Sequence, residues 1–369
     1  MLASRACRLR PIKLSSTTPF LRPTAYTNFK PMYSIRPITC STKLYKEDKR
    51  TPRVAERALE SHDDHHGSFS RTDNTVFIEH PDEANYPRER PYDGHGGMHF
   101  KRTLQSFTLD DKVAVVTGGA RGLGLVMSQA CLLSGANVAI VDLNKDEGER
   151  QAKAMVDHFM AENPGVDEEP KVTSHFCDVS DPESVTSTFN EIVGAHGQVD
   201  HLITSAGFTE NFDAIAYPPD RLNKLMGVDF NGTYFWACAV AKHLMARKEK
   251  GSMVMIGSMS GAIVNVPQPQ APYNAAKAAV RHLASSLAVE WAHAGIRVNV
   301  ISPGYMLTAL TEKILTENPE LYKHWTSLIP VGKMGKPEDL MGAVVYLLSE
   351  ASGYVTGADI RVDGGYTVT

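Results

Sequence analysis

From Leu109 onwards, short runs of β-branched and other apolar residues alternate with longer segments of helical periodicity. Such alternation predicts a parallel sheet with helices on both of its faces. The expected strands are residues 113–117, 138–142, 172–176, 202–204, 253–257, 298–302 and 360–362. Because all of them fall in one stretch of about 260 residues, we expect a single doubly wound, Rossmann-like α/β domain. We assign residues 106–369 to it.

The first 46 residues differ in composition from the rest of the chain. They contain nine Lys or Arg and no Asp or Glu, are rich in Ser and Thr, and lack a continuous apolar core. This composition is typical of an organellar transit peptide rather than of a secretory signal. We therefore expect residues 1–46 to direct import into the mitochondrial matrix. A basic partner-binding helix, or an incorrect translation start on a cytoplasmic protein, is the alternative.

Residues 47–105 are charged and rich in His and Pro, and they show neither helical nor strand periodicity. We interpret them as a poorly ordered linker. The run His62-Asp-Asp-His-His66 contains metal-ligand types, but no apolar frame would hold them, so we expect no metal site there. The five cysteines show no metal-ligand spacing either, and we expect free thiols.

The charge balance and hydropathy exclude two classes of partner. Without the basic first 46 residues, the chain holds 29 basic and 42 acidic residues, a balance of −13. Such an acidic body argues against nucleic acid as a partner, because phosphate binding needs a basic surface. No window approaches the roughly 18 uncharged apolar residues of a membrane span, so we expect no membrane insertion.

A glycine-rich segment, Thr117-Gly-Gly-Ala-Arg-Gly-Leu-Gly124, connects the first expected strand to a helix that continues to Leu133. Glycines in such a turn let backbone amides and the helix N-terminus approach a pyrophosphate. A tight turn without a ligand is the alternative. The cofactor residues expected here are Thr117, Gly118, Arg121, Gly122, Leu123 and Gly124.

Two carboxylates follow the next strands. Asp142 ends the second strand, where it suits hydrogen bonds to both ribose hydroxyls of the adenosine and repels a 2′-phosphate. This favours NAD, although Arg121 offers a possible partner for the 2′-phosphate of NADP. Asp178 follows the third strand, and is either a ligand of the adenine amino group or the cap of a helix that begins at Pro182.

Tyr273 and Lys277 are four residues apart in an expected helix, so their side chains share one face. An ammonium beside a phenol favours the phenolate, so a group with an ordinary pKa near ~10 exchanges protons closer to neutral pH. Ser258 ends an expected strand and offers a hydroxyl to the same space. With a dinucleotide loop upstream, these residues indicate alcohol–ketone redox chemistry.

These motifs together resemble those of the short-chain dehydrogenase/reductase family, over roughly residues 109–369. The matching motifs are the glycine loop, Asp142, Asp178, Ser258-x-x-Gly261, Tyr273-x-x-x-Lys277, Pro303-Gly304 and Val362-Asp-Gly-Gly365. The resemblance implies that Ser258 orients the reacting carbonyl, Tyr273 is the general acid/base, and Lys277 binds the nicotinamide ribose. Further cofactor contacts that it implies are Val179, Ala206, Gly207, Tyr273, Lys277, Pro303, Gly304 and Thr308.

Three positions leave alternatives or depart from the family pattern. Ser260 remains an alternative to Ser258, because the gap from Ser258 to Tyr273 is slightly longer than usual. Asp229 stands where the family often has Asn, in a segment that kinks a helix and holds a water beside the lysine; we expect the carboxylate to support this water and the charge of Lys277. Ser205 replaces the usual Asn before Ala206. Residues 305–334 are expected to form a mobile lid.

Within the family, residues 257–270 and 302–305 are most similar to fungal polyol dehydrogenases of the D-arabinitol 2-dehydrogenase and sorbose/xylulose reductase type. Asn265, Gln268 and Gln270 offer amide donors and acceptors, which a substrate with a hydroxyl on every carbon requires. Tyr305 either stacks on the substrate or covers the mouth of the pocket. We therefore expect a pentitol such as D-arabinitol and its ketose as substrates. An exposed turn before the catalytic helix is the alternative interpretation of these amides.

Two other functions fit the same motifs. A mitochondrial 3-oxoacyl-thioester reductase would need a basic surface for its acyl carrier, and Lys242, Arg281 and Arg297 are the candidates. A non-catalytic NAD-binding scaffold is the second alternative. The family resemblance implies a homodimer or homotetramer, and apolar residues on more than one face of the helices after Arg221 and Pro272 agree with it. These residues are Phe230, Trp236, Leu283 and Leu287.

Overall fold

Seven parallel strands form one sheet in the computed structural model, which describes residues 103–369. The strands are β1 (Val113–Thr117), β2 (Asn137–Asp142), β3 (Val172–Phe176), β4 (His201–Thr204), β5 (Gly251–Ile256), β6 (Ile296–Pro303) and β7 (Asp359–Val362). Their order is β3-β2-β1-β4-β5-β6-β7, which confirms the doubly wound sheet expected from the sequence. Two strands end one residue away from the expected position, because β5 stops at Ile256 rather than Gly257 and β6 continues to Pro303 rather than Ser302.

The expectations for residues 1–46 and for the run His62–His66 lie outside the described residues. Most of the linker expected at residues 47–105 lies outside them as well. Its last residues begin a short 3₁₀ helix, Thr103–Phe107. No helix among residues 103–369 is long and apolar enough to span a bilayer.

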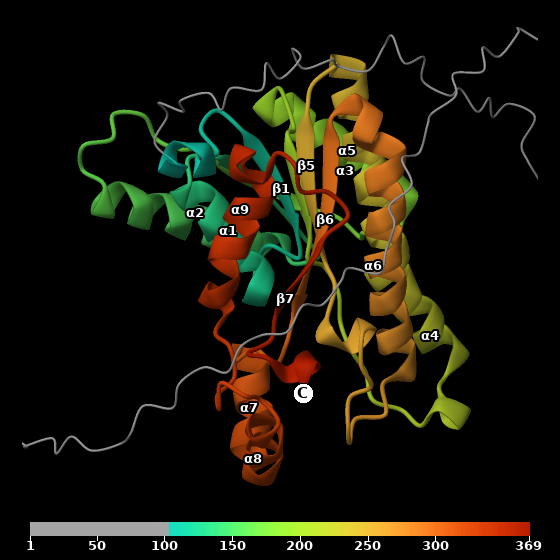
Figure 1. Cartoon of the computed structure of the whole chain (residues 1–369). Coiled ribbons are helices and arrows are strands. Elements are labelled where there is room, and N and C mark those ends of the chain that lie inside the picture. Colours follow the sequence, from blue (N-terminus) through green and yellow to red (C-terminus); the bar gives the residue numbers. More distant parts are fainter. Residues whose placement is uncertain (1–102) are drawn as a thin grey trace, which may run out of the picture. The chain divides into compact units, whose positions relative to one another are not determined.

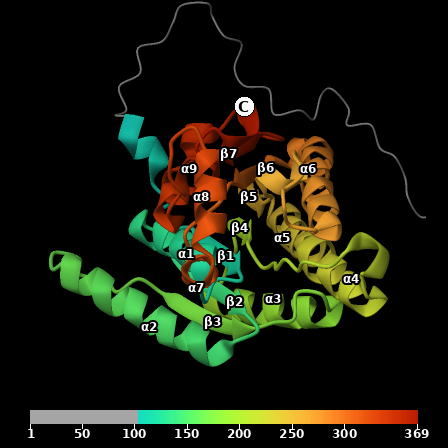
Figure 2. The same ribbon diagram turned by 90° about the horizontal axis from the view of Figure 1, so that it is seen from below.

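Nine helices are described in residues 103–369. They are α1 (Gly122–Leu133), α2 (Lys145–Glu162), α3 (Pro182–His196), α4 (Pro219–Met226), α5 (Thr233–Arg247), α6 (Ala271–Trp291), α7 (Ala309–Glu317), α8 (Pro319–Ser327) and α9 (Met341–Leu348). Helices α1, α2 and α9 lie on one side of the sheet, and α3, α5 and α6 lie on the other (Figures 1 and 2). The sheet is therefore the middle of three layers.

Two apolar cores result, one on each face of the sheet. Every residue of β1 and β5 is buried, because helices cover both faces of these central strands. This explains why the strands read as continuous apolar runs rather than as an alternating pattern. Trp236 and Leu287 belong to the core beneath α5 and α6 and are 0% and 4% exposed. Trp236 and Leu287 therefore belong to the faces of α5 and α6 that pack inside the subunit.

Helices α7 and α8 extend beyond one end of the sheet, and the C-terminus lies at the same end (Figure 1). They occupy the segment expected to form the lid. A small separate core includes Leu315, Trp325, Ile329 and Met334, with Tyr305 and Tyr366 packed against it. The lid segment therefore has an apolar interior of its own.

Candidate active site

The order of the strands places the expected site residues at one edge of the sheet. The order reverses between β1 and β4, which are neighbours with Thr117 paired to Thr204. In parallel sheets, ligands bind at the carboxyl ends of the strands beside such a reversal. The glycine loop follows β1, the Ser205–Gly207 loop follows β4, and Ser258 follows β5. Segments far apart in sequence thus meet at one place.

The glycine loop packs so closely that side chains would not fit at Gly118, Gly119 or Gly124. Gly118 has a φ of +66°, and a Cβ there would lie 2.9 Å from the backbone of Ala206. A Cβ at Gly124 would lie 2.1 Å from the carbonyl oxygen of Gly118. Gly122 differs, because its φ of +57° requires glycine while the space beside its Cα is open. An approaching ligand thus meets bare backbone at the start of α1.

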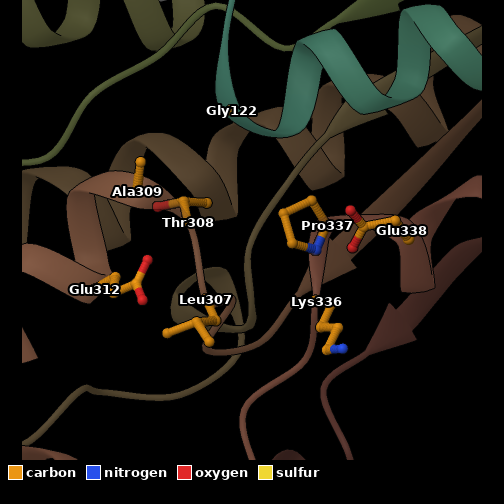
Figure 3. A pocket seen from close by; sticks show the side chains of 8 residues that line it. All are labelled: Gly122, Leu307, Thr308, Ala309, Glu312, Lys336, Pro337 and Glu338. Atoms are coloured by element: carbon orange, nitrogen blue, oxygen red, sulfur yellow. The ribbon is translucent and has the colours of Figure 1, made fainter.

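A cavity of about 350 Å³ adjoins this open position. Figure 3 shows Gly122 at the start of α1 above residues 307–312 on one side and residues 336–338 on the other. Thr308, expected to contact the cofactor, lies in its wall with Gly122. The other lining residues, which the sequence did not single out, are Leu307, Ala309, Glu312, Lys336, Pro337 and Glu338.

Asp142 lies at the end of β2 beside the glycine loop. Its Oδ2 accepts a hydrogen bond from the amide of Ala120 at 3.2 Å, and its Oδ1 accepts one from Asn144 at 3.0 Å. The carboxylate is only half-buried, so it remains open to a ligand on one side. Arg121, the possible partner for the 2′-phosphate of NADP, is exposed, and its side chain makes no hydrogen bond that caps α1.

Asp178 does not cap the helix at Pro182. Its Oδ1 accepts hydrogen bonds from the amide and hydroxyl of Ser180 at 2.9 and 2.6 Å. Asp181 caps α3 instead, because its side chain accepts from the amide of Glu183. The capping alternative was therefore wrong. Val179 is buried in the core under α3 and α5, so its side chain is not available to a ligand.

Thr117 joins the loops after β1 and β4. Its buried hydroxyl accepts hydrogen bonds from the amides of Ser205 and Ala206 at 3.1 and 3.2 Å. The side chain of this expected cofactor residue is thus engaged with the protein itself. It fixes the loop that carries Gly207, where a Cβ would lie 3.3 Å or less from both carboxylate oxygens of Asp229 and from Nζ of Lys277.

Ser258, Tyr273 and Lys277 converge on this edge from β5 and α6. The Oγ of Ser258 accepts a hydrogen bond from the amide of Ser260 at 3.1 Å, which leaves the serine proton free to be donated. Ser260, the alternative, has its hydroxyl 3.4 Å from Nε2 of Gln270. Nζ of Lys277 lies 5.6 Å from the centre of the Tyr273 ring and donates to the carbonyl of Ile256 at 3.1 Å.

Asp229 and Lys277 form a buried ion pair. Residues Gly227–Gly232 wind as a π-helix, and this turn points Asp229 towards α6. Its Oδ2 lies 3.5 Å from Nζ of Lys277, and its Oδ1 accepts from the amide of Phe208 at 3.0 Å. Burial raises the pKa of Asp229, although Lys277 opposes this change. Burial lowers the pKa of Lys277, but the attraction of Asp229 and Tyr273 together outweighs it, so the pKa is raised.

The loop after β6 fits closely against the C-terminal segment. Pro303 ends the strand, and the amide of Gly304 donates to the carbonyl of Val362 at 2.9 Å. A Cβ at Gly304 would lie 2.7 Å from the Cα of Asp363. The hydroxyl of Thr308 lies 3.1 Å from that of Thr311, at the start of α7. The loop therefore connects the sheet, the cavity and the lid segment.

The amides expected to contact substrate form one connected network. Nε2 of Gln270 donates to Oδ1 of Asn265 at 2.9 Å and to Oδ1 of Asn274 at 3.0 Å. Nδ2 of Asn265 lies 3.3 Å from the hydroxyl of Tyr305. Asn265 and Gln270 are 4% and 6% exposed, so the interpretation of an exposed turn was wrong for these two residues.

Trp325 and Tyr366, which the sequence did not single out, both pack on Tyr305. The Tyr305 ring is stacked on Trp325 of α8, with centroids 4.2 Å apart, and the edge of Tyr366 packs against it. In the orientation that satisfies both ends of its amide, Gln268 accepts from Nε1 of Trp325 and from the hydroxyl of Tyr305, each at 3.2 Å. No local pattern marks Trp325, because its partners are far away in the sequence.

Arg281, which the sequence offered only as part of a basic surface, joins three segments near the site instead. It lies on α6 one turn after Lys277, donates to the carbonyl of Gly261 at 2.7 Å, and pairs with Asp359 at 2.6 Å. Asp359 in turn accepts from the hydroxyl of Ser302 at 2.6 Å. These contacts tie the segment after Ser258 to the ends of β6 and β7.

The chain matches one family model and several solved structures over most of its length. The model described as enoyl-(acyl carrier protein) reductase matches residues 118–367. The crystal structure of a short-chain type dehydrogenase/reductase from Mycobacterium marinum is 34% identical, with a TM-score of 0.66. This match covers 73% of the present chain and 100% of the solved one.

Curated relatives are named as enzymes of sugar alcohols and ketoses. D-arabinitol 2-dehydrogenase (ribulose-forming) from Candida albicans is 42% identical, over 72% of this chain and 96% of its own length. The NADH-dependent L-xylulose reductase of Ambrosiozyma monospora is 41% identical, with 72% and 98% coverage. The NADP-dependent mannitol dehydrogenase of Hypocrea jecorina is also 41% identical, with 72% and 96% coverage.

Proposed function

Because the chain belongs to the short-chain dehydrogenase/reductase family, we propose that it is an NAD-dependent oxidoreductase that interconverts a sugar alcohol and its ketose. The observation that carries this proposal is the combination of Ser258, Tyr273 and Lys277 with a buried amide network beside them. A pentitol such as D-arabinitol is the proposed substrate. The similarity to curated polyol dehydrogenases supports it.

The residues at the sheet edge fit a nicotinamide dinucleotide. The open backbone at Gly122 and the adjoining cavity with Thr308 suit the pyrophosphate and the nicotinamide half. The proposed contacts of the adenosine half of the cofactor are Gly118, Asp142 and Asp178. Ala206, in the loop after β4, is a further proposed contact of the cofactor. When bound, this cofactor supplies the hydride acceptor for oxidation and the hydride donor for reduction.

Three side chains handle the reacting oxygen and its proton. Ser258 donates its free hydroxyl proton to the substrate oxygen and so fixes its position. Tyr273 takes the alcohol proton during oxidation and returns a proton to the carbonyl oxygen during reduction. Lys277, held by Ile256 and Asp229, supplies the positive charge that stabilises the phenolate. The proposed lid over residues 305–334 excludes water.

The choice of NAD over NADP rests on Asp142. A half-buried carboxylate beside the adenosine ribose binds its hydroxyls and repels a 2′-phosphate. The relatives include enzymes named for each cofactor. The position of Asp142 at the glycine loop is the reason for preferring NAD here.

The amide network supports a polyol as the substrate. A site that surrounds the substrate with buried hydrogen-bonding groups favours a molecule with a hydroxyl on each carbon, and rejects analogues that lack one. Asn265, Gln268, Gln270 and Tyr305 are the proposed substrate contacts. They already bond one another, so a bound polyol would exchange hydrogen bonds rather than create unpaired groups.

The thioester-reductase alternative loses support from the same structure. Arg281 is paired with Asp359, and Arg297 donates to backbone carbonyls at the end of α9, including those of Leu347 and Ser349. Neither guanidinium is therefore available as part of a basic docking surface. Only Lys242 remains of the three candidates for an acyl carrier.

We also propose that the enzyme acts in the mitochondrial matrix as a homodimer or homotetramer. The basic, acid-free composition of residues 1–46 supports import. Of the apolar side chains on α5 and α6, Tyr234 and Val289 are 43% and 80% exposed and suit a subunit contact.

The direct test is the initial rate of NADH formation by residues 47–369. Arabinitol, xylitol, sorbitol, mannitol and ribitol are each assayed with NAD. Parallel assays replace NAD by NADP, or follow the consumption of NADH with acetoacetyl thioester as the substrate. Turnover of one pentitol with NAD is the expected result. Reduction of the thioester together with no turnover of any polyol would overturn the proposal. Cofactor binding without any turnover would support the scaffold alternative.

A further inference from the structure

The ion pair between Asp229 and Lys277 has a consequence for the chemistry of Tyr273. Asp229 is fully buried, and Lys277 is 5% exposed. Water therefore screens their charges weakly. At 3.5 Å they attract each other as charges, while Oδ2 of Asp229 accepts no well-aligned hydrogen bond from any described residue. The carboxylate thus faces the ammonium as its main charged partner.

The lysine acts on Tyr273 through its charge, over a distance of 5.6 Å to the ring centre. A negative charge placed beside the lysine subtracts from that effect, because both charges act on the phenolate in the same weakly polar space. The net charge behind the tyrosine is then close to zero rather than +1. We propose that Asp229 acts as a positioning residue that neutralises Lys277 and so moves proton removal by Tyr273 to higher pH.

The groups that face this pair are few. Within residues 103–369, Tyr273 comes from α6, and Tyr217 comes from the segment before α4. The hydroxyl of Tyr217 is buried without a hydrogen-bond partner in the described part of the chain, and both its burial and Asp229 raise its pKa. The backbone contributes the amide of Phe208 and the carbonyl of Ile256. None of these groups supplies a second positive charge to offset the carboxylate.

The expected direction is independent of which group loses the proton. The form with charged lysine and phenolate and the form with both groups neutral have the same net charge. Their ratio does not depend on pH. Removing the negative charge of Asp229 makes loss of one proton from the pair easier in either case. The pH–rate profile must therefore move to lower pH.

The inference rests on the proposed function, and it is tested with Asp229→Asn. Asparagine keeps an oxygen to accept from Phe208, removes the charge and carries an NH₂ in place of the second oxygen. We expect the midpoints of both the oxidation and the reduction profile, measured as kcat/KM, to move to lower pH by about one unit or more. Asp229→Ala should move them in the same direction. Midpoints that stay in place or rise in folded variants would overturn the inference.

A matched control removes a different buried carboxylate. Asp200 is 3% exposed at the opposite end of the sheet, where it accepts from the amide of Val113. Asp200→Asn should leave the midpoints unchanged. A purely structural role of Asp229 would lower the rate at every pH without shifting the profile.

A second measurement needs no substrate. The ultraviolet difference between wild type and Tyr273→Phe isolates the tyrosinate signal of this residue during a pH titration. The same difference spectrum, measured between Asp229→Asn and the Asp229→Asn/Tyr273→Phe double variant, should show the tyrosinate signal appearing at a lower pH than in the wild type. Absence of turnover on every polyol would contradict the proposed function but leave this titration intact. An unshifted titration would contradict the inference alone.

Discussion

The rings of Tyr305 and Trp325 are stacked, with centroids 4.2 Å apart and planes 10° from parallel. Tyr305 follows β6 beside the proposed substrate amides, whereas Trp325 belongs to α8 in the lid segment. The indole N–H also bonds the Gln268 amide. The stack thus joins the first residue of the lid segment to α8, and the hydrogen bond to Gln268 fastens α8 to the substrate side.

Loss of this stack should weaken substrate binding. Trp325→Ala removes a stacked pair worth about 1 kcal/mol beyond its buried area, so we expect KM for the polyol to rise about fivefold or more, with the affinity for NADH nearly unchanged. Trp325→Phe keeps a ring but loses the N–H and should have a smaller effect. Steady-state kinetics and NADH fluorescence titration measure the two quantities.

Trp291→Phe is the matched control, because Trp291 packs on the core under α6 rather than on the lid. An unchanged KM in Trp325→Ala would show that the lid does not depend on this contact. Equal changes in NADH affinity and in KM would instead indicate a general loss of structure.

Tyr273→Phe should remove turnover. The substitution deletes the only atom proposed to move the proton, and general acid–base catalysis commonly contributes about 10²–10⁴-fold to the rate. NADH affinity should remain close to that of the wild type. Tyr234→Phe, on the exposed side of α5, is the control and should keep full activity. A kcat for Tyr273→Phe near that of the wild type would refute the assignment.

Asp142→Ala should narrow the preference for NAD over NADP by about tenfold or more, because it removes a charge that repels the 2′-phosphate. The ratio of kcat/KM for the two cofactors measures the change. Asp146→Ala alters the net charge equally, in the first turn of α2, and should leave the ratio unchanged. The assignment of Asp142 would fail if both variants gave the same ratio as the wild type.

The free energy of unfolding should decrease as the pH falls from 6.5 to 4, and we expect the buried His201 to account for part of this decrease. Burial lowers the pKa of His201 from 6.5 to about 4. Between these pH values the imidazole binds a proton in the unfolded state but not in the folded state. This difference amounts to about 3 kcal/mol at pH 4 and below, and vanishes above pH 6.5. Urea unfolding at several pH values measures it.

His201→Asn isolates this contribution. His196, whose pKa burial also lowers to about 4, keeps its own dependence in both proteins. The difference between the two stability curves should therefore change by about 3 kcal/mol across this range. Parallel curves would show that His201 takes up its proton equally in the folded and unfolded states.

The local patterns of the sequence predicted much of the fold. The strand expected at residues 113–117 matches β1, and the helix expected to continue to Leu133 ends at that residue. Tyr273 and Lys277 lie on one helix, as their spacing predicted. These features depend on residues close together in the chain, where backbone geometry fixes the periods of strand and helix.

The helix cap shows where a local pattern was insufficient. Asp178 and Asp181 both precede Pro182, and either side chain could cap α3 from its type alone. The structure gives the cap to Asp181, because Asp178 turns its carboxylate to Ser180. The choice between two similar side chains depended on the path of the backbone after β3.

Taken by itself, the sequence determined the order of strands and helices, the glycine loop at β1, and the shared helix of Tyr273 and Lys277. Only the tertiary structure decided that Asp229 forms an ion pair with Lys277 and that Trp325 stacks on Tyr305. These contacts join residues 48 and 20 positions apart, each pair carried by separate elements. Their distances depend on how those elements pack, so no repeat period in the sequence encodes them.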